Sequence, residues 1–523
     1  MSDEPRPEPL DLDDVDESDL EYRPFVKYVG LGLMLCAMAG SCYAAYRLGR
    51  TMGFQDGVSS EQVAESINAA AVQNLQYVMQ LASAEDSTLA ALAAHPESTL
   101  AWIRDGSVRA EVQWHLADIM LKRGMIQEVQ PLLDIIRQKA PADPVWASRV
   151  LTAADALAEA GNGDAKKYYR FAADRYKGLQ MRAEYITALS AMSAYLMNES
   201  DDAALQALLQ ETESIKPEAV SLRSAVMLHR ALDMQLRGNA AAAVGIFDTI
   251  LAEVQKAQPN LTPAAIVCAG VTMVEQGADS ALAVNLLQKG EAALGSTYAD
   301  MQVRLLALRY LAKVEESREN YQPALGLLSR AEGAASGRVP KDNAFWPCLH
   351  VQRGWLHFVC RDAEHAANDF ALALKRTNDV ALKVQALEGA SRCNIMLGKV
   401  DEAAKQAEEC LQLRRTHYPE LKSDIGRILL IQAKICDQKN DKNTALDLYA
   451  QAADLLTGDA EDERDNRLDA LYGRAYILSK QGHWEQAAPV WEAILPLVQD
   501  QRDLLEEARS YLRHCRNNSA LHP

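Results

Sequence analysis

The 523-residue sequence predicts an all-α protein: an α-solenoid of about ten helix pairs behind one N-terminal transmembrane helix. Apolar residues recur at three- and four-residue steps along about four fifths of the chain, which is the spacing of one helix face. The composition agrees, because 49% of the residues are apolar and only 6% are aromatic, a balance that suits closely packed helices. Each pair in a solenoid packs only on its neighbours, so this length does not require several globular domains.

The helix pair is plainest near the C-terminus. A first helix carries Ala475 and Leu478 on one face, and a second helix carries Ala487 and Trp491. Gly482 separates them, since glycine tolerates the left-handed conformation that ends a helix. Two small residues twelve positions apart let the helix backbones approach closely. This pattern resembles the tetratricopeptide repeat (TPR), and the resemblance implies an array of antiparallel helix pairs that binds other proteins.

The same pattern recurs ten times when the small residue of each first helix is taken as an anchor. The anchors are Ala117, Ala153, Ser193, Ala231, Gly270, Ala312, Gly354, Ser391, Ala433 and Ala475. Twelve residues later come Val129, Ala165, Leu205, Ala243, Leu282, Ala324, Ala366, Ala403, Ala445 and Ala487. Four positions further, all but Ala407 are large: Leu133, Tyr169, Leu209, Phe247, Leu286, Leu328, Phe370, Tyr449 and Trp491. The anchors are 36 to 42 residues apart, against 34 in the family, so longer helices or loops are expected.

Five segments follow from these patterns. Residues 1–24 form an acidic, disordered tail; residues 25–48 a transmembrane helix; and residues 49–103 a juxtamembrane linker with a helical N-terminal cap. Residues 104–500 form the repeat array, and residues 501–523 a C-terminal capping helix and tail. Short helical pieces are expected at 87–94 and 97–103. The final helix is expected at 502–515, with fraying after residue 516.

The transmembrane prediction rests on nineteen residues without a charge, Tyr28 to Tyr46, bracketed by Lys27 and Arg47. About 20 apolar residues span a bilayer as a helix. A cleaved signal peptide, a lipoprotein modified at Cys42 and a buried soluble helix are the alternatives. Three Lys/Arg residues precede the span and two follow it closely. This bias favours a cytoplasmic N-terminus and a repeat array in the periplasm or otherwise outside the cytoplasm.

Charge and motifs exclude several functions. The net charge of −18 argues against a nucleic-acid partner, which needs a basic face. The sequence has no Gly-rich phosphate loop, no G-x-S-x-G elbow and no H-E-x-x-H, so neither an enzyme nor a cofactor is predicted. Seven of the nine cysteines lie outside the predicted span, without any C-x-x-C pair. Neither a disulfide framework nor a zinc ribbon is indicated.

One group of potential ligands is Cys348, His350, His357, Cys360 and His365. Only His357 and Cys360 are spaced to share a metal from one helix face, and the histidines occupy packing positions, so no metal site is predicted. Some TPR domains hold a partner's C-terminal carboxylate with Lys, Asn and Arg on first helices. The comparable positions here carry Trp114, Asp118, Leu151 and Asp155, which cannot form that clamp.

The leading hypothesis is a membrane-tethered scaffold that binds a protein or peptide partner through the concave surface of the solenoid. The membrane is engaged through residues 28–46. A self-associating structural component of an envelope or secretion assembly is the alternative, with Gly49, Gly53 and Gly57 as added contacts between copies. A metal-dependent enzyme that uses the 348–365 cluster is the remote alternative.

Overall fold

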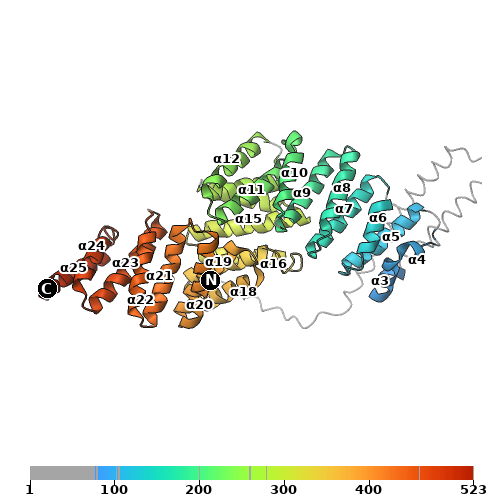
Figure 1. Ribbon diagram of the computed structural model, residues 1–523. Coiled ribbons are helices and arrows are strands. Elements are labelled where there is room, and N and C mark those ends of the chain that lie inside the picture. The colour runs from blue at the N-terminus through green and yellow to red at the C-terminus, as the bar shows by residue number, and fades with distance from the viewer. Residues whose placement is uncertain are drawn as a thin grey trace, which may run out of the picture. The chain divides into compact units, whose positions relative to one another are not determined.

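A computed structural model describes residues 77, 80–101, 103, 106–139, 141–199, 201–257, 261–277, 280–458 and 460–521. The predicted acidic tail, the predicted span Tyr28–Tyr46 and the three glycines after it lie outside these residues. Among the described helices, none combines the length and the apolar character needed to cross a bilayer. The described secondary structure consists of 23 α-helices and one short 3-10 helix, without a strand, as the sequence periodicity predicts (Figure 1).

The chain divides into two compact units, residues 1–139 and 140–523. In the first unit, α3 (Asp86–Ala94) packs on the helix pair α5 (Gly106–Lys122) and α6 (Gln130–Lys139). The short helix α4 (Pro96–Thr99) lies between them in the chain and is shorter than expected. Arg123, after α5, donates hydrogen bonds to the carbonyl oxygens of Ala82 and Ala84 and pairs with Asp86 at 2.7 Å. These contacts attach the N-terminal helix to the first repeat.

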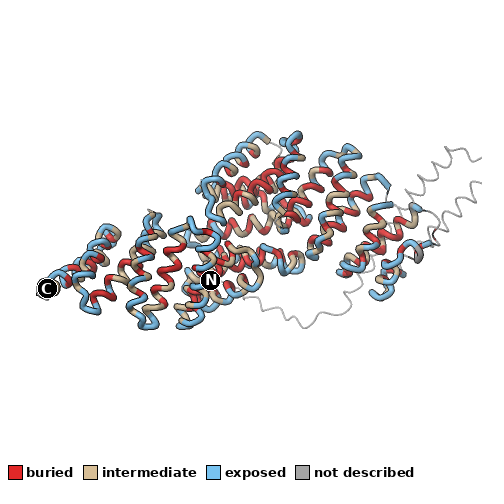
Figure 2. The backbone as a smooth tube through the Cα atoms, in the orientation of Figure 1, coloured by how far each residue is buried: buried red, intermediate tan, exposed pale blue. Residues whose placement is uncertain are grey.

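The second unit contains nine helix pairs followed by one closing helix. In each pair the first helix packs against the second, and successive first helices also meet along most of the unit. Figure 2 shows the buried residues gathered where these helices face one another. The pairs are α7 (Pro144–Glu159) with α8 (Ala165–Gly178), α9 (Arg182–Asn198) with α10 (Asp202–Glu211), α11 (Val220–Leu236) with α12 (Ala240–Lys256), α13 (Pro263–Glu275) with α14 (Ser280–Ala293), α15 (Tyr298–Ser317) with α16 (Tyr321–Ala335), α17 (Phe345–Val359) with α18 (Ala363–Arg376), α19 (Val380–Met396) with α20 (Val400–His417), α21 (Lys422–Gln438) with α22 (Lys442–Leu455), and α23 (Glu461–Lys480) with α24 (Trp484–Ile494); α25 (Arg502–Leu521) closes the unit, and η2 (Glu213–Ile215) follows α10.

All ten anchors are buried, and so are nine of the ten small or apolar residues that follow them by twelve positions. Trp491 is fully buried and donates its indole N–H to Ser479 Oγ at 3.0 Å. Ala475 and Ala487 have no exposed surface, consistent with close approach of α23 and α24. The architecture is therefore a TPR-like array of antiparallel helix pairs.

The register predicted for one repeat is wrong by one residue. Leu282 was expected inside the pair α13/α14, but 48% of its surface is exposed, whereas Ala283 and Leu287 are buried. Ala283 follows the anchor Gly270 by thirteen positions, one more than the twelve between Ala475 and Ala487. The extra residue rotates the start of α14 by one position, so the apolar stripe begins at Ala283.

The turns within the pairs share one left-handed residue, seven positions after most anchors. Gly482 has a φ of 78°, as predicted from its place after Ser479-Lys-Gln. The corresponding residues Glu319, Arg361 and Asn440 adopt the same conformation with φ of 61–64° although they carry side chains. Left-handed backbone costs an L-residue about 1–2 kcal/mol, so the surrounding helix pair imposes the turn at these three sites.

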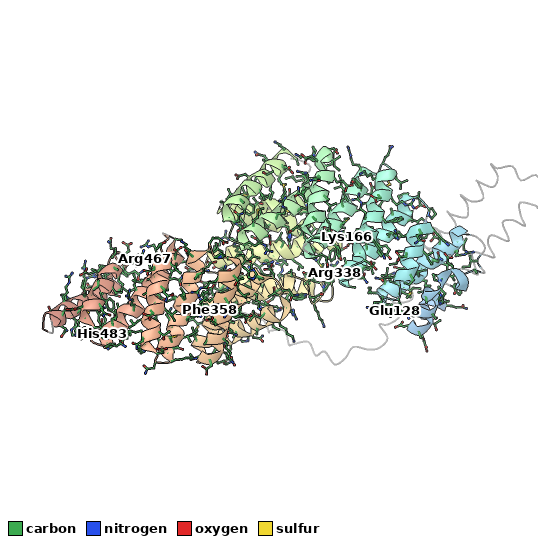
Figure 3. All side chains as sticks on the ribbon, viewed as in Figure 1. Glu128, Lys166, Arg338, Phe358, Arg467 and His483 are labelled. Atoms are coloured by element: carbon green, nitrogen blue, oxygen red, sulfur yellow. The ribbon has the colours of Figure 1, made fainter. Side chains whose placement is uncertain are left out.

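Two contacts fold distant repeats of the second unit onto each other. The helix α15 contacts α7 and α9, where Asn198 donates a hydrogen bond to the Tyr298 hydroxyl at 2.6 Å. Arg338, labelled in Figure 3, follows α16 and donates a hydrogen bond to Glu159 of α7 at 2.7 Å. The first five repeats of this unit therefore close back on themselves, which periodicity alone does not predict.

The closing helix is longer than expected. α25 continues to Leu521 rather than ending at residue 515, so the expected fraying after residue 516 is wrong as far as the described chain extends. Ala508, Leu512 and Cys515 form its buried stripe. Beyond that stripe, Arg516 pairs with Glu492 of α24 at 2.5 Å. This ion pair secures the last turns to the preceding repeat.

Candidate functional site

The structure places His350 in a packed polar network on α17. Its Nδ1 lies 3.0 Å from Asp369 Oδ1 of α18, and its Nε2 lies 3.3 Å from Arg376 Nη1. An arginine only donates, so Nε2 accepts and Nδ1 carries the proton that is donated to Asp369. Arg353 also donates to Asp369, at 2.7 Å. Both ring nitrogens are thus engaged in hydrogen bonds that connect α17 with α18.

Asp369 is the buried carboxylate of this network, with only 3% of its surface exposed. Burial by itself would raise its pKa, but hydrogen bonds from His350 and Arg353 outweigh burial and lower the pKa. The carboxylate therefore stays charged and holds α17 against α18. Arg353 extends the network to Glu332 of α16 at 2.6 Å.

The remaining members of the 348–365 group do not converge on one point. His357 stacks on the exposed His365 at 5.4 Å between ring centroids, and His365 Nδ1 donates a hydrogen bond to the Asp362 carboxylate at 2.8 Å. Cys348 and Cys360 are both half-buried free thiols, and burial raises the pKa of Cys348. Within the described part of the chain, no three His, Cys, Asp or Glu side chains are grouped to hold a metal ion.

The side chains at the positions comparable to a carboxylate clamp also make contacts within the protein itself. On α5, Trp114 is buried and Asp118 pairs with Lys122 at 2.6 Å. On α7, the Asp155 carboxylate accepts a hydrogen bond from the Tyr169 hydroxyl at 2.8 Å. Burial raises the pKa of Asp155 to about 6 despite that hydrogen bond. These acidic positions offer no cation to a partner's carboxylate.

A cavity of about 640 Å³ lies on the first helices of the C-terminal repeats. Four successive first helices contribute to its wall, namely α17, α19, α21 and α23. The opposite side is formed by the end of α11 and the turn after it. The lining residues are Gln235, Leu236, Gly238, Trp355, Gln385, Glu388, Arg392, Arg414, Leu421, Asp424, Arg427, Asp462 and Asn466.

Charged side chains dominate the wall of this cavity. Glu388 Oε1 accepts from Arg392 at 2.9 Å and from Arg427 at 3.4 Å. Asp424 pairs with Arg414 and with Arg427, each at 2.7 Å. Three guanidinium groups and two carboxylates thus form the partly buried network, and the exposed Asp462 adds a third carboxylate to the lining.

Glu388 is nearly fully buried, with 5% of its surface exposed. Burial would raise its pKa, but the positive charges of Arg427, Arg392 and Arg414 outweigh burial and lower the pKa. A buried charge of this kind persists only when it is paired, because its desolvation is costly. Glu388 therefore holds the arginines in place and keeps their guanidinium groups at the cavity.

Two of these guanidinium groups keep unused donors. The Nε atoms of Arg392 and Arg414 are buried and have no hydrogen-bond partner among the described residues. Arg414 is 6% exposed, so its Nε cannot be satisfied by bulk solvent. Leaving such a donor unpaired costs about 1–3 kcal/mol, so each of the two atoms is an energetic cost within the packed network.

An aromatic side chain borders the same charges. Trp355 of α17 lines the cavity, and the Arg392 guanidinium carbon lies 5.7 Å from the centroid of its ring. Trp355 is fixed from behind by Phe358 and Phe370, whose rings meet it edge-on at 5.6 and 5.3 Å. Phe358 is labelled in Figure 3. The cavity therefore combines a wall of paired charges with the ring of Trp355.

The far side of the cavity comes from a distant repeat. A Cβ atom at Gly238, in the turn after α11, would lie 2.7 Å from both methyl carbons of Leu421, which precedes α21. The neighbouring Arg237 reaches Asp379 before α19 at 3.3 Å. The turn thus packs tightly on the loop that closes the cavity, because a side chain at position 238 would have to displace Leu421, and the φ of 84° at this position also favours glycine.

Sequence reasoning did not single out any of the charged residues in this cavity. A signal was present in the segment Leu387-Glu-Gly-Ala-Ser-Arg392, where two charges four residues apart interrupt small and apolar residues next to an anchor. However, charged residues on a first helix are equally consistent with a helix face that is exposed to solvent. Their convergence depends on Arg414 from α20, the second helix of the same repeat, and on Arg427 from the next repeat.

No protein-family model and no curated protein sequence matches this chain. Among solved structures, the C-terminal part of a TPR repeat-containing protein from Cytophaga hutchinsonii aligns with a TM-score of 0.33 and 14% identity, over 55% of this chain and 99% of the other. The apo form of the quorum sensor NprR from B. thuringiensis aligns with a TM-score of 0.43 and 13% identity, over 67% of this chain and 97% of the other. At these TM-scores the TPR-like architecture rests on the helix pairs of the chain itself.

Proposed function

We propose that this protein is a membrane-tethered scaffold that binds a segment of another protein on the face formed by its first helices. The observation that carries the proposal is the cavity bounded by α17, α19, α21 and α23. Its volume of about 640 Å³ is within the range of ligand sites, and its charged lining favours a polar occupant. In the repeat family, first helices form the concave surface on which partners bind. The proposal assigns no catalytic role.

The tether is the predicted span Tyr28–Tyr46, and the array is proposed to lie outside the cytoplasm. The positive-inside rule supports this orientation through the Lys/Arg residues that precede the span. In a bacterium the array would then be in the periplasm, where exposed thiols are oxidised. Cys268, Cys393 and Cys410 are buried and Cys436 is half-buried, which suits such a compartment.

Site-specific photo-crosslinking tests the binding role. Gln385 lines the cavity, so a benzoylphenylalanine in its place in the full membrane-bound chain should crosslink to a partner protein. Glu402, exposed on the second helix α20, is the matched control and should give no such product. Equal products at both sites, or none at Gln385, would refute binding at this face. A product of two copies of this chain would instead favour the self-associating alternative.

The topology is tested separately, by protease treatment of intact spheroplasts of a bacterial host that expresses the full chain. Loss of the C-terminal helix α25 from immunoblots is expected if the array is exported. Full protection until lysis would place the array in the cytoplasm. That result would reverse the orientation and change the compartment in which a partner is sought.

A further inference from the structure

The turn between α11 and α12 reaches across the second unit to repeats that follow much later in the chain. Arg237 donates a hydrogen bond to Asp379, 142 residues away in sequence, at 3.3 Å. The next residue, Gly238, packs on Leu421, in the loop between α20 and α21. These two contacts, Arg237–Asp379 and Gly238–Leu421, form a latch between the middle repeats and the C-terminal repeats.

The latch is also one side of the cavity. Gln235, Leu236 and Gly238 line the cavity from α11 and its turn, and Leu421 lines it from the opposing loop. The other lining residues belong to α17, α19, α20, α21 and α23. Separation of the turn from Leu421 would therefore widen the cavity without disturbing the helix pairs that form the rest of its wall.

The latch is weak compared with the contacts between neighbouring helices. The side chains of Arg237 and Asp379 are 48% and 32% exposed, and ion pairs at such exposure contribute little and are screened by salt. Arg237 Nε also donates to both carboxylate oxygens of Asp233 at 2.9 Å. Asp379 also caps α19, by accepting a hydrogen bond from the Leu382 N–H at 3.0 Å. Neither charge is thus left without a partner when the latch opens.

The packing of whole helices points the same way. Among the described helices, α11 packs extensively on α9, α12 and α13, but not on α19 or α21. The other closure of the array is different, because α15 itself packs on α7 and α9, with Tyr298 only 2% exposed. That closure buries part of a helix, so we expect it to persist when the latch opens.

We propose that the latch is a gate: while closed it limits the cavity to small occupants, and its opening admits the protein segment that the array binds. This step rests on the proposed binding function and adds how access to the site is controlled. The apparent affinity for the segment is reduced by the fraction of chains that are closed. A substitution that weakens the latch therefore raises both access and apparent affinity.

Thiol labelling of Gln385→Cys in the purified full chain, without a partner, measures access to the cavity. A small maleimide is compared with one linked to a bulky polyethylene glycol, and mass spectrometry of peptides separates residue 385 from the native cysteines. Glu402→Cys, at an exposed position of α20, provides the reference rate. Relative to that reference, the bulky reagent should label residue 385 at least about tenfold more slowly than the small reagent does.

Substitutions in the latch connect that rate to the gate. Arg237→Gln and Asp379→Asn should each speed bulky labelling of residue 385 about two- to fivefold, the range that an exposed ion pair contributes, and added salt should do the same with the latch unchanged. Asparagine still caps α19. Arg230→Gln is the matched control, since Arg230 of the same helix donates to Gln206 of α10 at 2.7 Å. It should leave the rate unchanged.

A disulfide tests the closed state. A Cβ atom at position 238 lies 3.1 Å from Leu421 Cγ, so Gly238→Cys with Leu421→Cys suits a disulfide, whose Cβ atoms are about 3.5–4.5 Å apart. Oxidation of this pair should abolish the crosslink from benzoylphenylalanine at Gln385 to a partner, and reduction should restore it. The reduced chain carries the same two substitutions and is its own control.

Three results would overturn the gate. They are equal relative rates of bulky and small labelling at residue 385, bulky labelling unchanged in both Arg237→Gln and Asp379→Asn, and equal crosslinking in the oxidised and reduced chains. The labelling results do not bear on the binding role, because they are obtained without a partner. A missing crosslink at Gln385, in a chain whose labelling shows the gate to open as described, would instead refute the binding function.

Discussion

The substitution Gly389→Ala should destabilise the repeats that build the cavity. Gly389 of α19 and Gly354 of α17 flank the fully buried ring of Phe370. A methyl group at Gly389 would lie 2.5 Å from Cε1 and Cε2 of that ring and closer still to Cζ. The ring cannot move freely because Trp355 meets its edge at 5.3 Å. The substitution therefore forces the two helices apart or displaces Phe370.

The expected magnitude combines two opposing effects. Overpacking of a core costs about 1–3 kcal/mol. Alanine in a helix interior gains about 0.5–1 kcal/mol over glycine. The net destabilisation is thus about 0.5–2 kcal/mol. Gly326→Ala is a matched control, because Gly326 lies inside α16 and a Cβ there meets nothing within 4 Å. The control should stabilise its helix by about 0.5–1 kcal/mol.

Hydrogen exchange measured by mass spectrometry gives the local free energies, since damage in a solenoid stays near its origin. Peptides from α17, α18 and α19 should exchange faster in Gly389→Ala, by about tenfold for each 1.4 kcal/mol, and those from α7 should not change. Adding Phe370→Leu to Gly389→Ala should remove part of the destabilisation, because the smaller leucine side chain leaves space for the added methyl group. Exchange as slow as in Gly326→Ala would refute the packing argument.

Three further substitutions test other parts of the chain by chemical denaturation. Burial raises the pKa of Asp155 to about 6, so the stability of the wild type should fall by up to about 3 kcal/mol as the pH rises from about 4 to about 6. The Asp155→Asn variant keeps a hydrogen-bond acceptor for Tyr169. It should be more stable than the wild type at pH 7 but not at pH 4. The hydrogen bond from Arg170 lowers the pKa of Glu211 to about 2, so Glu211→Gln should cost about 2 kcal/mol at pH 7, with the difference lost as the pH falls from about 4.5 towards 2. Ala487→Leu should destabilise the last repeats by about 1–3 kcal/mol, since Ala487 is fully buried, and an unchanged transition would contradict its place between packed helices.

The sequence by itself determined the helix pairs and most of their buried residues. Apolar spacing is a local property, and in a solenoid each helix buries its stripe on neighbours close in the chain. Ala475, Ala487 and Trp491 are therefore buried where periodicity places them. The turn at Gly482 was equally predictable, because a left-handed residue favours glycine. The tether at Tyr28–Tyr46 and the orientation remain predictions from hydropathy and charge.

Only the tertiary structure decided the left-handed turn at Arg361, because the surrounding helix pair imposes it against the local preference of the residue. The structure also showed that the apolar stripe near Leu282 is shifted by one residue. It also decided the cavity. From the sequence alone, Glu388 is expected to be a solvent-exposed charge on a helix, because its contact with Arg427 of the next repeat is seen only in the structure. The turn at Gly238 closes the site from a repeat far away in the chain, where no periodicity connects the two segments. A cavity made by convergence of distant elements depends on how the repeats stack, and stacking angles are not encoded in any single helix.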